Sequence, residues 1–256
     1  MSNSDWLSIR EAMDFRFRCL PLARKFMESA VERQLIVDLG CGTGANYRYL
    51  SSVLDAEVRW LCIDNDDRAL EAAKKKLPDS FFQFKKGDLA TDLKLIPFCD
   101  DISITASAFL DITSQDWLHR FASRCERIPL LISMTSSGGP IWDPIDDLDE
   151  TIGRCLAAHR VGDHGFGPAA GPNASDLLAS NLKSRGCHVS LEASNWRLDD
   201  QDNQVIEFLI GGIGRRASEV LPHEQVGEWM KRRRDQTRAG SLGLTMPHLD
   251  LLSLPE

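Results

Sequence analysis

Between residues 35 and 134 the sequence alternates short apolar runs with amphipathic stretches, and this alternation limits the chain to few architectures. The apolar runs predict five strands, at 35–39, 58–63, 80–84, 101–108 and 129–134. The stretches between them predict helices at about 44–54, 66–77 and 114–127. Strands that alternate with helices form a parallel sheet with helices on both faces. We therefore expect a doubly wound, Rossmann-like α/β fold.

The segments on either side of this region predict additions to the sheet. Residues 1–30 predict a helical cap, with one helix over 5–30. Residues 137–175, which follow the fifth strand, are rich in glycine and proline around one helix at about 147–160. Long irregular stretches of this kind usually form lids or binding loops. Later elements are expected as helices at 175–185, 203–218 and 223–236 and strands at 187–193 and 241–246. One domain over 1–256, with a seven-stranded and mostly parallel sheet, accounts for all of them.

The acidic balance of the chain argues against nucleic acid as a general partner. Thirty Lys and Arg residues stand against 38 Asp and Glu residues, which gives a formal charge of −8 and a pI of about 5.3. Such a molecule repels polyanions unless a basic patch is local. One basic cluster, 231–238, is interpreted as a solvated helix end, where cations suit the negative end of the helix dipole.

Cysteine and histidine spacing predicts no metal site. The seven cysteines include no C-x-x-C pair, and the six histidines form no H-x-x-x-H or His/Cys cluster. No apolar run approaches the roughly 20 residues that span a bilayer. We therefore expect a cytoplasmic protein with reduced cysteines and no membrane partner. The sequence leaves the oligomeric state open.

A glycine-rich loop follows the first predicted strand. It reads Asp38-Leu39-Gly40-Cys41-Gly42-Thr43-Gly44-Ala45-Asn46, and its glycines let backbone N–H groups approach a ligand closely. In doubly wound sheets, ligands bind beyond the carboxyl ends of the strands. Asp64 ends the second strand, twenty positions after Gly44, where a carboxylate can accept hydrogen bonds from both hydroxyls of a ribose.

Further acids narrow the ligand. The spacing is G-x-G-x-G instead of the dinucleotide pattern G-x-G-x-x-G, and Asp38 precedes it. An acid at that place repels a pyrophosphate but can pair with the ammonium of an amino-acid group. Asp88 ends the third strand at the same sheet edge, where it can meet the N6 of adenine while Leu89 packs on the ring. Each acid alone could be a loop cap, but three at successive strand ends indicate a nucleoside that carries an amino acid.

These segments resemble motifs of class I S-adenosylmethionine-dependent methyltransferases. The matching stretches are VDLGCGTGAN, CIDND, KKGDLA and TASAFLD, within about residues 30–135. The resemblance implies that the backbone around Gly40 and Gly42 lies along the methionine part of the donor, that Asp64 binds the ribose, and that Asp88 and Leu89 bracket adenine. The full predicted donor site is Asp38, Gly40, Cys41, Gly42, Gly44, Asn46, Asp64, Asn65, Asp88, Leu89 and Ser107.

A narrower resemblance extends over nearly the whole chain. Trp6-Leu7, Trp142-Asp143-Pro144, the segment His159 to Pro168, and the terminal His248 to Leu252 are similar to a group of bacterial class I methyltransferases. That group usually has a lysine where this chain has His164. The resemblance names no methyl acceptor. From the predicted elements, we divide the domain into a cap (1–30), a donor-binding half (31–136), a lid or acceptor insertion (137–175), and the rest of the sheet with its helices (176–256).

Acceptor residues are expected on three elements. Asp111, after the fourth strand, either orients an acceptor or caps the next helix. Arg10, Asp14 and Arg18 share a helical stripe that forms an ion-pair ladder or reaches into the cleft, where arginines bind carboxylate or phosphate. In the insertion, His159 is a candidate proton acceptor or a structural residue. The remaining candidates for acceptor binding are Asp163 and two aromatic residues that form a wall or the core, Trp142 and Phe166.

The preferred function is methyl transfer by in-line displacement to a small-molecule acceptor, with catalytic roles for Asp111 and His159. S-adenosylmethionine is the expected donor and S-adenosylhomocysteine the product. One alternative is an RNA methyltransferase that uses the basic cluster 231–238, which salt-dependent RNA binding would reveal. The other is a catalytically silent S-adenosylmethionine-binding partner protein. The intact glycines and acids of the donor loop argue against the silent alternative.

Overall fold

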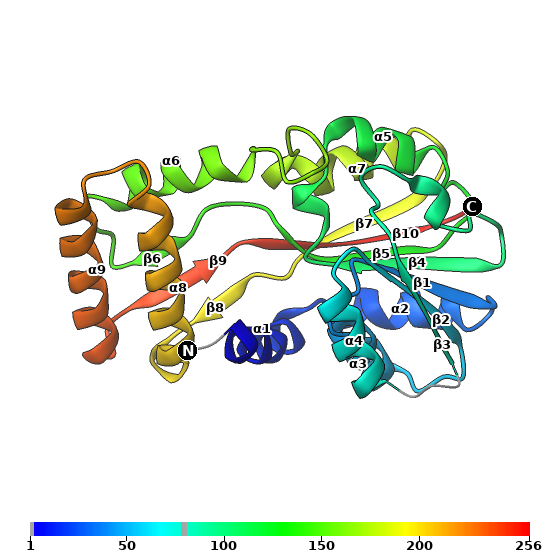
Figure 1. The fold of residues 1–256 in the computed structure, drawn as a ribbon, viewed down its shortest axis with the longest axis horizontal. Helices are drawn as coiled ribbons and strands as arrows, with labels where there is room; N and C mark the ends of the chain where they lie inside the picture. The colour runs from blue at the N-terminus through cyan, green and yellow to red at the C-terminus, as the bar shows by residue number, and fades with distance from the viewer. Residues whose placement is uncertain (1–2, 78–80) are drawn as a thin grey trace.

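A seven-stranded sheet forms the larger lobe of the molecule (Figure 1). Its strand order is β3-β2-β1-β4-β5-β10-β7, with β10 antiparallel to both neighbours. The strand bounds are β1 Leu35–Leu39, β2 Arg59–Asp64, β3 Phe82–Lys86, β4 Ile102–Ser107, β5 Leu130–Ser136, β7 His188–Ala193 and β10 His248–Leu254. The expected seven-stranded, mostly parallel, Rossmann-like sheet is confirmed.

The computed structural model describes residues 3–77 and 81–256, with side chains from residue 9 onward. The side chains of Trp6 and Leu7, and the first residue of the strand predicted at 80–84, lie outside the described residues.

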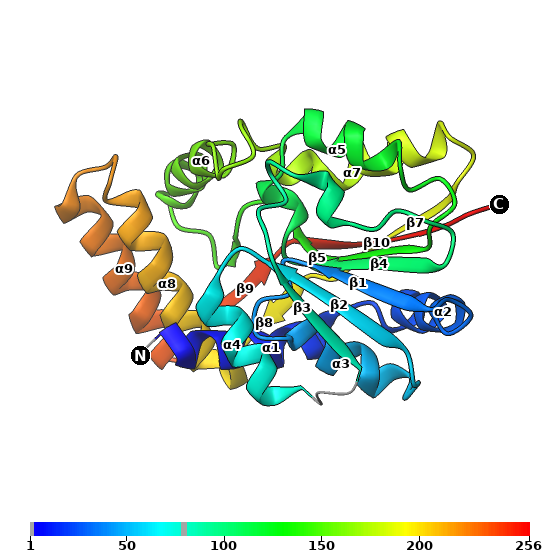
Figure 2. The same ribbon diagram turned by 45° about the vertical axis from the view of Figure 1, so that its right-hand side comes forward.

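Helices cover both faces of the larger sheet, as Figures 1 and 2 show. On one face, α5 (Gln115–Ala122) and α7 (Ala174–Lys183) pack over an apolar core with β1, β4 and β5. On the other face, α2 (Leu20–Ala30) and α3 (Ala45–Val53) pack over a second core, and α4 (Asp67–Lys76) lies beside β3. Because both faces are covered, the central strands are buried along almost their whole length, which explains their continuous apolar runs.

A smaller sheet organises the second lobe, which we call the accessory lobe. Its strands are β6 (Ile141–Asp143), β9 (Gly243–Met246) and β8 (Trp196–Leu198), all antiparallel in the order β6-β9-β8. Three helices complete it: α6 (Asp149–Arg160), α8 (Asn203–Ala217) and α9 (His223–Arg238). The lobe has its own core, in which Trp142, Trp196 and Trp229 are buried. Single-turn 3-10 helices occur at Leu93–Leu95, Leu110–Ile112 (η2), Gly171–Asn173 and Asp200–Asp202.

The structure corrects two predicted elements. The helix expected over 5–30 is two helices, α1 (Asn3–Phe17) and α2, because Pro21 is tolerated in the first turn of a helix but breaks a helix interior. The strand expected at 241–246 is β9 of the accessory sheet. The main sheet instead ends with β10, which begins after Pro247 and was not predicted as a strand.

The insertion expected at 137–175 does not stand alone. Its β6 and α6 pack with β9 and α8, which come from the last sixty residues of the chain. The accessory lobe is therefore assembled from the insertion and from the segment 196–246 together, with α1 beside β8 (Figure 1). Closure of this region over a ligand stays a prediction.

The two lobes meet at the buried carboxylate of Asp250. It accepts hydrogen bonds from the Met134 N–H at 2.7 Å, the Ser194 hydroxyl at 2.7 Å and the Cys19 N–H at 2.8 Å. Met134 has a φ of 55°, a strained value for a side-chain-bearing residue, and the β5–β10 pairing shifts register beside Asp250. One carboxylate thus fixes the bend of β5, strand β10 and the break between α1 and α2.

We predict that Asp250→Asn lowers the free energy of unfolding by about 1–3 kcal/mol. An amide has one oxygen where the carboxylate offers two, and its NH₂ group would face a backbone donor. Urea unfolding at equal protein concentration measures the change. Asp235→Asn, at an exposed ion pair on α9, serves as the control and should shift stability by less than about 0.5 kcal/mol. Equal midpoints for the two variants would contradict the role of Asp250.

Candidate active site

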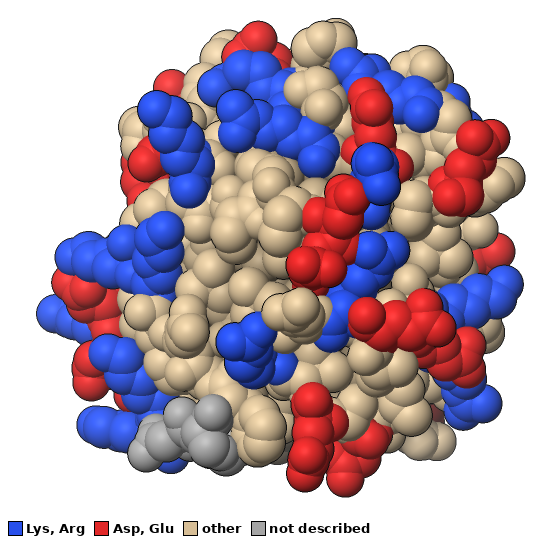
Figure 3. Space-filling model, turned by 90° about the vertical axis from the view of Figure 1, so that its right-hand side faces the viewer, with Lys and Arg blue, Asp and Glu red and all other residues tan. Residues whose placement is uncertain are grey.

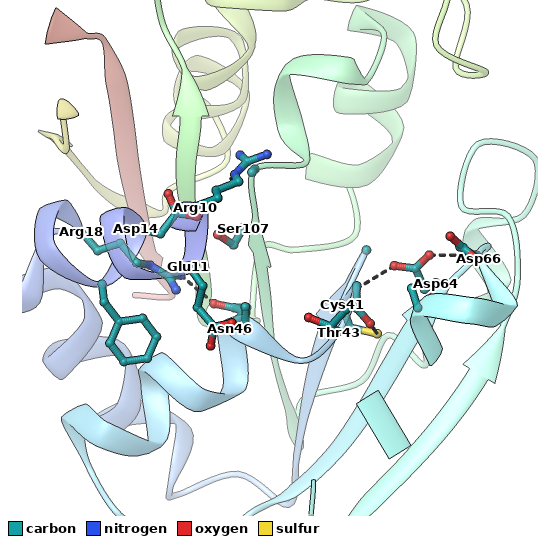
Figure 4. Close-up of a pocket in the computed structure, with 16 residues that line it drawn as sticks. Arg10, Glu11, Asp14, Arg18, Cys41, Thr43, Asn46, Asp64, Asp66 and Ser107 are labelled. Carbon is teal, nitrogen blue, oxygen red and sulfur yellow. Dashed lines mark hydrogen bonds and ion pairs between the residues drawn. The ribbon is translucent and has the colours of Figure 1, made fainter. Parts of the chain in front are cut away.

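A cavity of about 360 Å³ lies beyond the carboxyl ends of β1, β2 and β4 (Figure 4). The loop after β1 forms its floor, Asp64 and Asp66 at the end of β2 form one side, and α1 forms the opposite wall. This is the edge of a doubly wound sheet at which ligands bind. The lining residues are Arg10, Glu11, Asp14, Phe15, Arg18, Gly40, Cys41, Gly42, Thr43, Ala45, Asn46, Asp64, Asp66, Ala69, Ser107 and Ala108.

The glycines of the loop are required by its shape. Gly40 has a φ of 63°, and a Cβ there would come within 2.8 Å of the Phe109 ring. Gly42 has a φ of 54°, but a Cβ there would meet no described atom within 4 Å. Gly42 lines the cavity, so its missing side chain leaves open space for a ligand to lie against the backbone.

Asp64 is held in a fixed orientation at the end of β2. Its Oδ2 accepts a hydrogen bond from the Gly42 N–H at 2.8 Å, and its Oδ1 accepts one from the Asp66 N–H at 2.9 Å. Figure 4 shows both contacts at the side of the cavity opposite α1. A carboxylate oxygen can accept two hydrogen bonds, so each keeps one acceptor position for a ligand hydroxyl.

Asp38 lies beneath the cavity and not in its lining. Its side chain is fully buried and accepts a hydrogen bond at 2.7 Å from Asn46, whose oxygen in turn accepts one at 2.6 Å from Arg18. Burial raises the pKa of Asp38 from its ordinary 3.8 to about 7, and the Asn46 bond and the Arg18 charge oppose that shift. Hydrogen bonds thus link Asp38 to the lining residues Asn46 and Arg18, and a direct contact of Asp38 with a ligand stays a prediction.

Helix α1 brings both signs of charge to the cavity wall. The Arg10 Nε lies 3.6 Å from the Asp14 carboxylate, and burial raises the pKa of Asp14 against the nearby charges of Arg10 and Arg18. Arg18 Nε is buried with no hydrogen-bond partner among the described residues, and the Asp14 carboxylate also interacts with Trp196. The helix is held over the loop by a two-bond ion pair between Glu11 and Arg48, at 2.6 and 2.8 Å. This wall therefore suits a group that carries both an ammonium and a carboxylate.

A second cavity, of about 370 Å³, lies between the lobes' helices near η2. The predicted residues Asp111 and His159 both line it, together with Arg160 and His164. Burial raises the pKa of Asp111, while the charges of Arg10, Arg160 and His164 oppose the rise. Arg10 lines the first cavity, and its charge lowers the pKa of Asp111 in the second. A charged group of one cavity therefore acts on a titratable group of the other. The rest of the lining is mostly apolar and consists of Ile112, Leu156, Phe208, Leu209, Gly212, Ile213, Met246 and Arg216.

The predicted donor residues divide into two groups. The lining of the first cavity includes Gly40, Cys41, Gly42, Asn46, Asp64 and Ser107. Outside the lining, in addition to Asp38, are Gly44, Asn65, Asp88 and Leu89. Gly44 begins α3, and Asp88 is exposed and caps its own turn through the Ala90 N–H. The Leu89 side chain is buried in the core of the larger lobe, so it does not present a surface to this cavity.

Three predicted acceptor residues have structural surroundings instead. Trp142 is buried in the accessory core, with the Arg233 guanidinium 4.9 Å from its ring centre. Asp163 caps the glycine turn by accepting hydrogen bonds from the N–H groups of residues 165 and 167. Phe166 packs edge-to-face on Phe109 and Trp117, away from both cavities. The core and loop-cap interpretations account for these three residues.

Sequence reasoning missed several lining residues. In the first cavity these are Glu11, Phe15, Thr43, Ala45, Asp66, Ala69 and Ala108. In the second they include Arg160, His164 and the apolar face of α8. Residues next to a predicted motif could have been included by proximity, as Thr43 and Asp66 show. The apolar face of α8 gives no such signal, because an apolar stripe has the same sequence pattern whether it faces the core or a cavity.

The basic cluster 231–238 is largely neutralised by ion pairs. Arg232 contacts Asp146 at 2.6 Å, Arg234 contacts Glu207 at 3.1 Å, and Arg238 contacts Asp235 at 3.1 Å. The fully buried Arg233 pairs with Asp149. Figure 3 shows another face of the molecule, on which basic and acidic side chains are interspersed. Arg232 and Arg233 thus hold α9 against residues 144–149, and Arg234 holds it against α8.

Neither a metal cluster nor a membrane span occurs in the described part of the chain. No three His, Cys, Asp or Glu side chains of residues 9–77 and 81–256 gather as a metal site needs. No described helix is long and apolar enough to cross a bilayer.

Comparison with known proteins identifies the fold and the domain. Phosphoethanolamine N-methyltransferase 2 of Haemonchus contortus, solved with phosphomonomethylethanolamine and S-adenosylhomocysteine, superposes with a TM-score of 0.50 at 12% identity, over 93% of this chain and 52% of that chain. A cyclopropane synthase from Mycobacterium tuberculosis gives 0.49 at 12% identity, over 91% and 82% of the two chains. A search of curated proteins gave no significant match.

The sheet order and the loop after β1 define the class I fold of S-adenosylmethionine-dependent methyltransferases. Residues 36–128 match the family model described as "Methyltransferase domain". The matched stretch runs from β1 to the segment that follows α5, and it contains the glycine loop, Asp64 and Ser107.

We predict that Asp38→Asn stabilises the ligand-free protein at high pH. The pKa of Asp38 is about 7 when folded and 3.8 ordinarily, so the unfolded chain binds fewer protons between these values and stability falls as pH rises. A neutral amide avoids this cost. The gain in Tm should be small at pH 4 and reach several degrees at pH 8, at about 2–4 °C per kcal/mol.

Thermal unfolding of both proteins from pH 4 to pH 8 measures the difference. Asp88→Asn, at an exposed carboxylate two residues beyond β3, is the control and should follow the wild type throughout. A difference between Asp38→Asn and wild type that stayed constant with pH would remove the titration of Asp38 as the cause.

Proposed function

We propose that this protein transfers the methyl group of S-adenosylmethionine to a small-molecule acceptor. The observation that carries the proposal is the first cavity. It has the fixed carboxylate of Asp64 at one side and the acidic and basic side chains of α1 at the other. Those features match two parts of the donor, its ribose and its amino acid. The open space at Gly42 lies between them, where the methionine part would pass.

Each end of the cavity fits its part of the donor. Asp64 would accept hydrogen bonds from the ribose hydroxyls with the acceptor positions that Gly42 and Asp66 leave free. The unpartnered buried Nε of Arg18 would bind the carboxylate, and the Asp14 carboxylate would bind the ammonium. A buried polar atom without a partner is costly, so a ligand that satisfies the Arg18 Nε gains binding free energy.

The chemistry asks little of the protein beyond alignment. S-adenosylmethionine supplies an activated methyl group when bound. The loop from Gly40 to Asn46 and the wall of α1 would hold the donor in one orientation and exclude water from it. Ser107 and Ala108, at the end of β4, also line this cavity, and the chain reaches Asp111 three residues later.

The acceptor would lie in the second cavity. Asp111 and His159 line it and are the candidates for orienting the acceptor and for taking its proton, where the acceptor holds one. The raised pKa of the half-buried Asp111 favours that role. A cavity of about 370 Å³ lies in the range of small-molecule sites. The ion-paired arginines of α9 offer little free charge to RNA, which favours the small-molecule acceptor over the RNA alternative.

We predict that Asp64→Ala weakens binding of S-adenosylhomocysteine by about 10- to 100-fold, through the loss of roughly 1–3 kcal/mol of hydrogen bonding to a charged group. Isothermal titration measures the affinity. Asp92→Ala is the control, because Asp92 also caps a backbone N–H but lies outside the cavity. Unchanged affinity in Asp64→Ala, or binding of NAD in place of S-adenosylhomocysteine by the wild type, would overturn the proposed donor.

We predict that Gly42→Ala weakens the same binding by about tenfold or more, because the new methyl group would occupy space meant for the ligand. Gly165→Ala is the matched control: both glycines have positive φ, and neither Cβ would meet a described atom. The two substitutions therefore carry a similar backbone cost. Equal donor affinity in the two variants would show that the space at Gly42 is not part of the donor site.

A further inference from the structure

The second cavity combines an apolar wall with an arginine that forms no ion pair with a described residue. On the apolar side, α8 contributes Phe208, Leu209 and Ile213, and β9 contributes Met246. On the other side, α6 contributes His159 and Arg160, with His164 stacked on His159 at a ring distance of 5.6 Å. One side therefore suits an apolar group of a ligand, and the other suits a polar or charged group.

Arg160 is the half-buried cation of this cavity. Its guanidinium donates a hydrogen bond to the Gly138 carbonyl and forms no ion pair with a described residue. Asp111 is near enough for its charge to act on Arg160, and burial raises the pKa of that carboxyl. A half-buried guanidinium without an ion-pair partner favours an anion, and its fork suits a carboxylate or a phosphate.

The other cation of the lining does not compete with Arg160. Arg216 is largely exposed and pairs with Glu219 at 3.2 Å, so its charge is already balanced at the surface. Arg160 is therefore the one arginine of the described lining without an ion pair, with the Asp111 carboxyl nearby, and the apolar wall of α8 lines the same cavity.

We infer that the methyl acceptor is an amphipathic anion, with a carboxylate or phosphate at Arg160 and an apolar body against α8. The inference rests on the proposed function for the identity of this molecule as the acceptor. An uncharged apolar molecule would leave Arg160 unpartnered. A wholly polar anion would leave the α8 wall without apolar contact, and a cation would meet Arg160 as a like charge.

The first test uses octanoate, octyl phosphate, octylamine and 1-octanol as probes, titrated into the full-length protein. Octanoate, octyl phosphate or both should bind at least about tenfold more tightly than octylamine and octanol, as expected for a charge-assisted hydrogen bond. Binding of octanoate alone identifies a carboxylate site, and binding of octyl phosphate alone identifies a phosphate site. Equal or tighter binding of octylamine, or no binding of either anion, overturns the inference.

The apolar wall is tested by chain length in the wild type, so this arm does not depend on a variant that folds. Hexanoate, heptanoate and octanoate, or the matching alkyl phosphates if only octyl phosphate binds, should differ by roughly fourfold per methylene group if the chain is buried. Affinity that does not change with chain length would place the anion on the surface and contradict the role of α8.

The charge is tested with Arg160→Gln, which should weaken binding of the anionic probe by at least about tenfold. Arg160→Lys should restore part of the affinity, because it keeps the charge without the planar fork. Arg154→Gln is the matched control, since Arg154 is exposed one and a half turns earlier on the same helix and lies outside the cavity. Unchanged affinity in Arg160→Gln would overturn the assignment.

Titration with S-adenosylhomocysteine separates this inference from the proposed function. Arg160→Gln should keep wild-type affinity for S-adenosylhomocysteine, which also shows that the variant is folded. If the wild type binds the anions but not S-adenosylhomocysteine, the amphipathic site stands and the proposed donor fails. If it binds S-adenosylhomocysteine but no anionic probe, the donor site stands and this inference fails.

Discussion

The carboxylate of Asp250 is the constraint on which the arrangement of the two lobes depends. Its three hydrogen bonds reach the break before α2, the bend in β5 and the loop before β8. A buried charge is tolerated where donors surround it, and here the donors come from segments that are distant in the sequence. This junction therefore fixes where the chain passes from β9 of the accessory sheet to β10 of the larger sheet, and where α1 ends and α2 begins. Because α1 forms the wall of the first cavity, the geometry of the site follows from this buried junction.

How far the sequence predicts this molecule depends on how local the causes are. The strands and helices between residues 35 and 134 were predicted well, because each is specified by its own periodicity and by the turn residues beside it. The accessory sheet was not predicted, because its strands of three or four residues come from segments more than forty residues apart. Trp142 and Trp196 carry no local sign that they share one core. The extra strand β10 was missed for a related reason, since its antiparallel pairing with β5 and β7 is a tertiary choice.

The site shows the same division. The glycine loop and Asp64 could be placed from the sequence, because both lie at strand ends that one sheet edge must bring together. Asp38 was placed at the right edge, but its burial beneath Asn46 could not be foreseen, because depth depends on packing and not on spacing. Arg160 was overlooked beside His159, although both line the second cavity. In each case the sequence indicated which residues gather near one another, and packing decided which of them face open space.

Helix α1 is fastened at two points, and this has a consequence for how the cavities communicate. Glu11 ties it to Arg48 beside the glycine loop, and Arg16 ties it to Asp202 at the start of α8, with bonds of 2.8 and 3.0 Å. The helix is thus a single rigid link between the donor loop and the element that supplies the apolar wall. A molecule in either cavity that shifts this link changes the affinity of the other cavity, and thermodynamic reciprocity makes the factor equal in both directions. Donor and acceptor would then assist or exclude each other without touching.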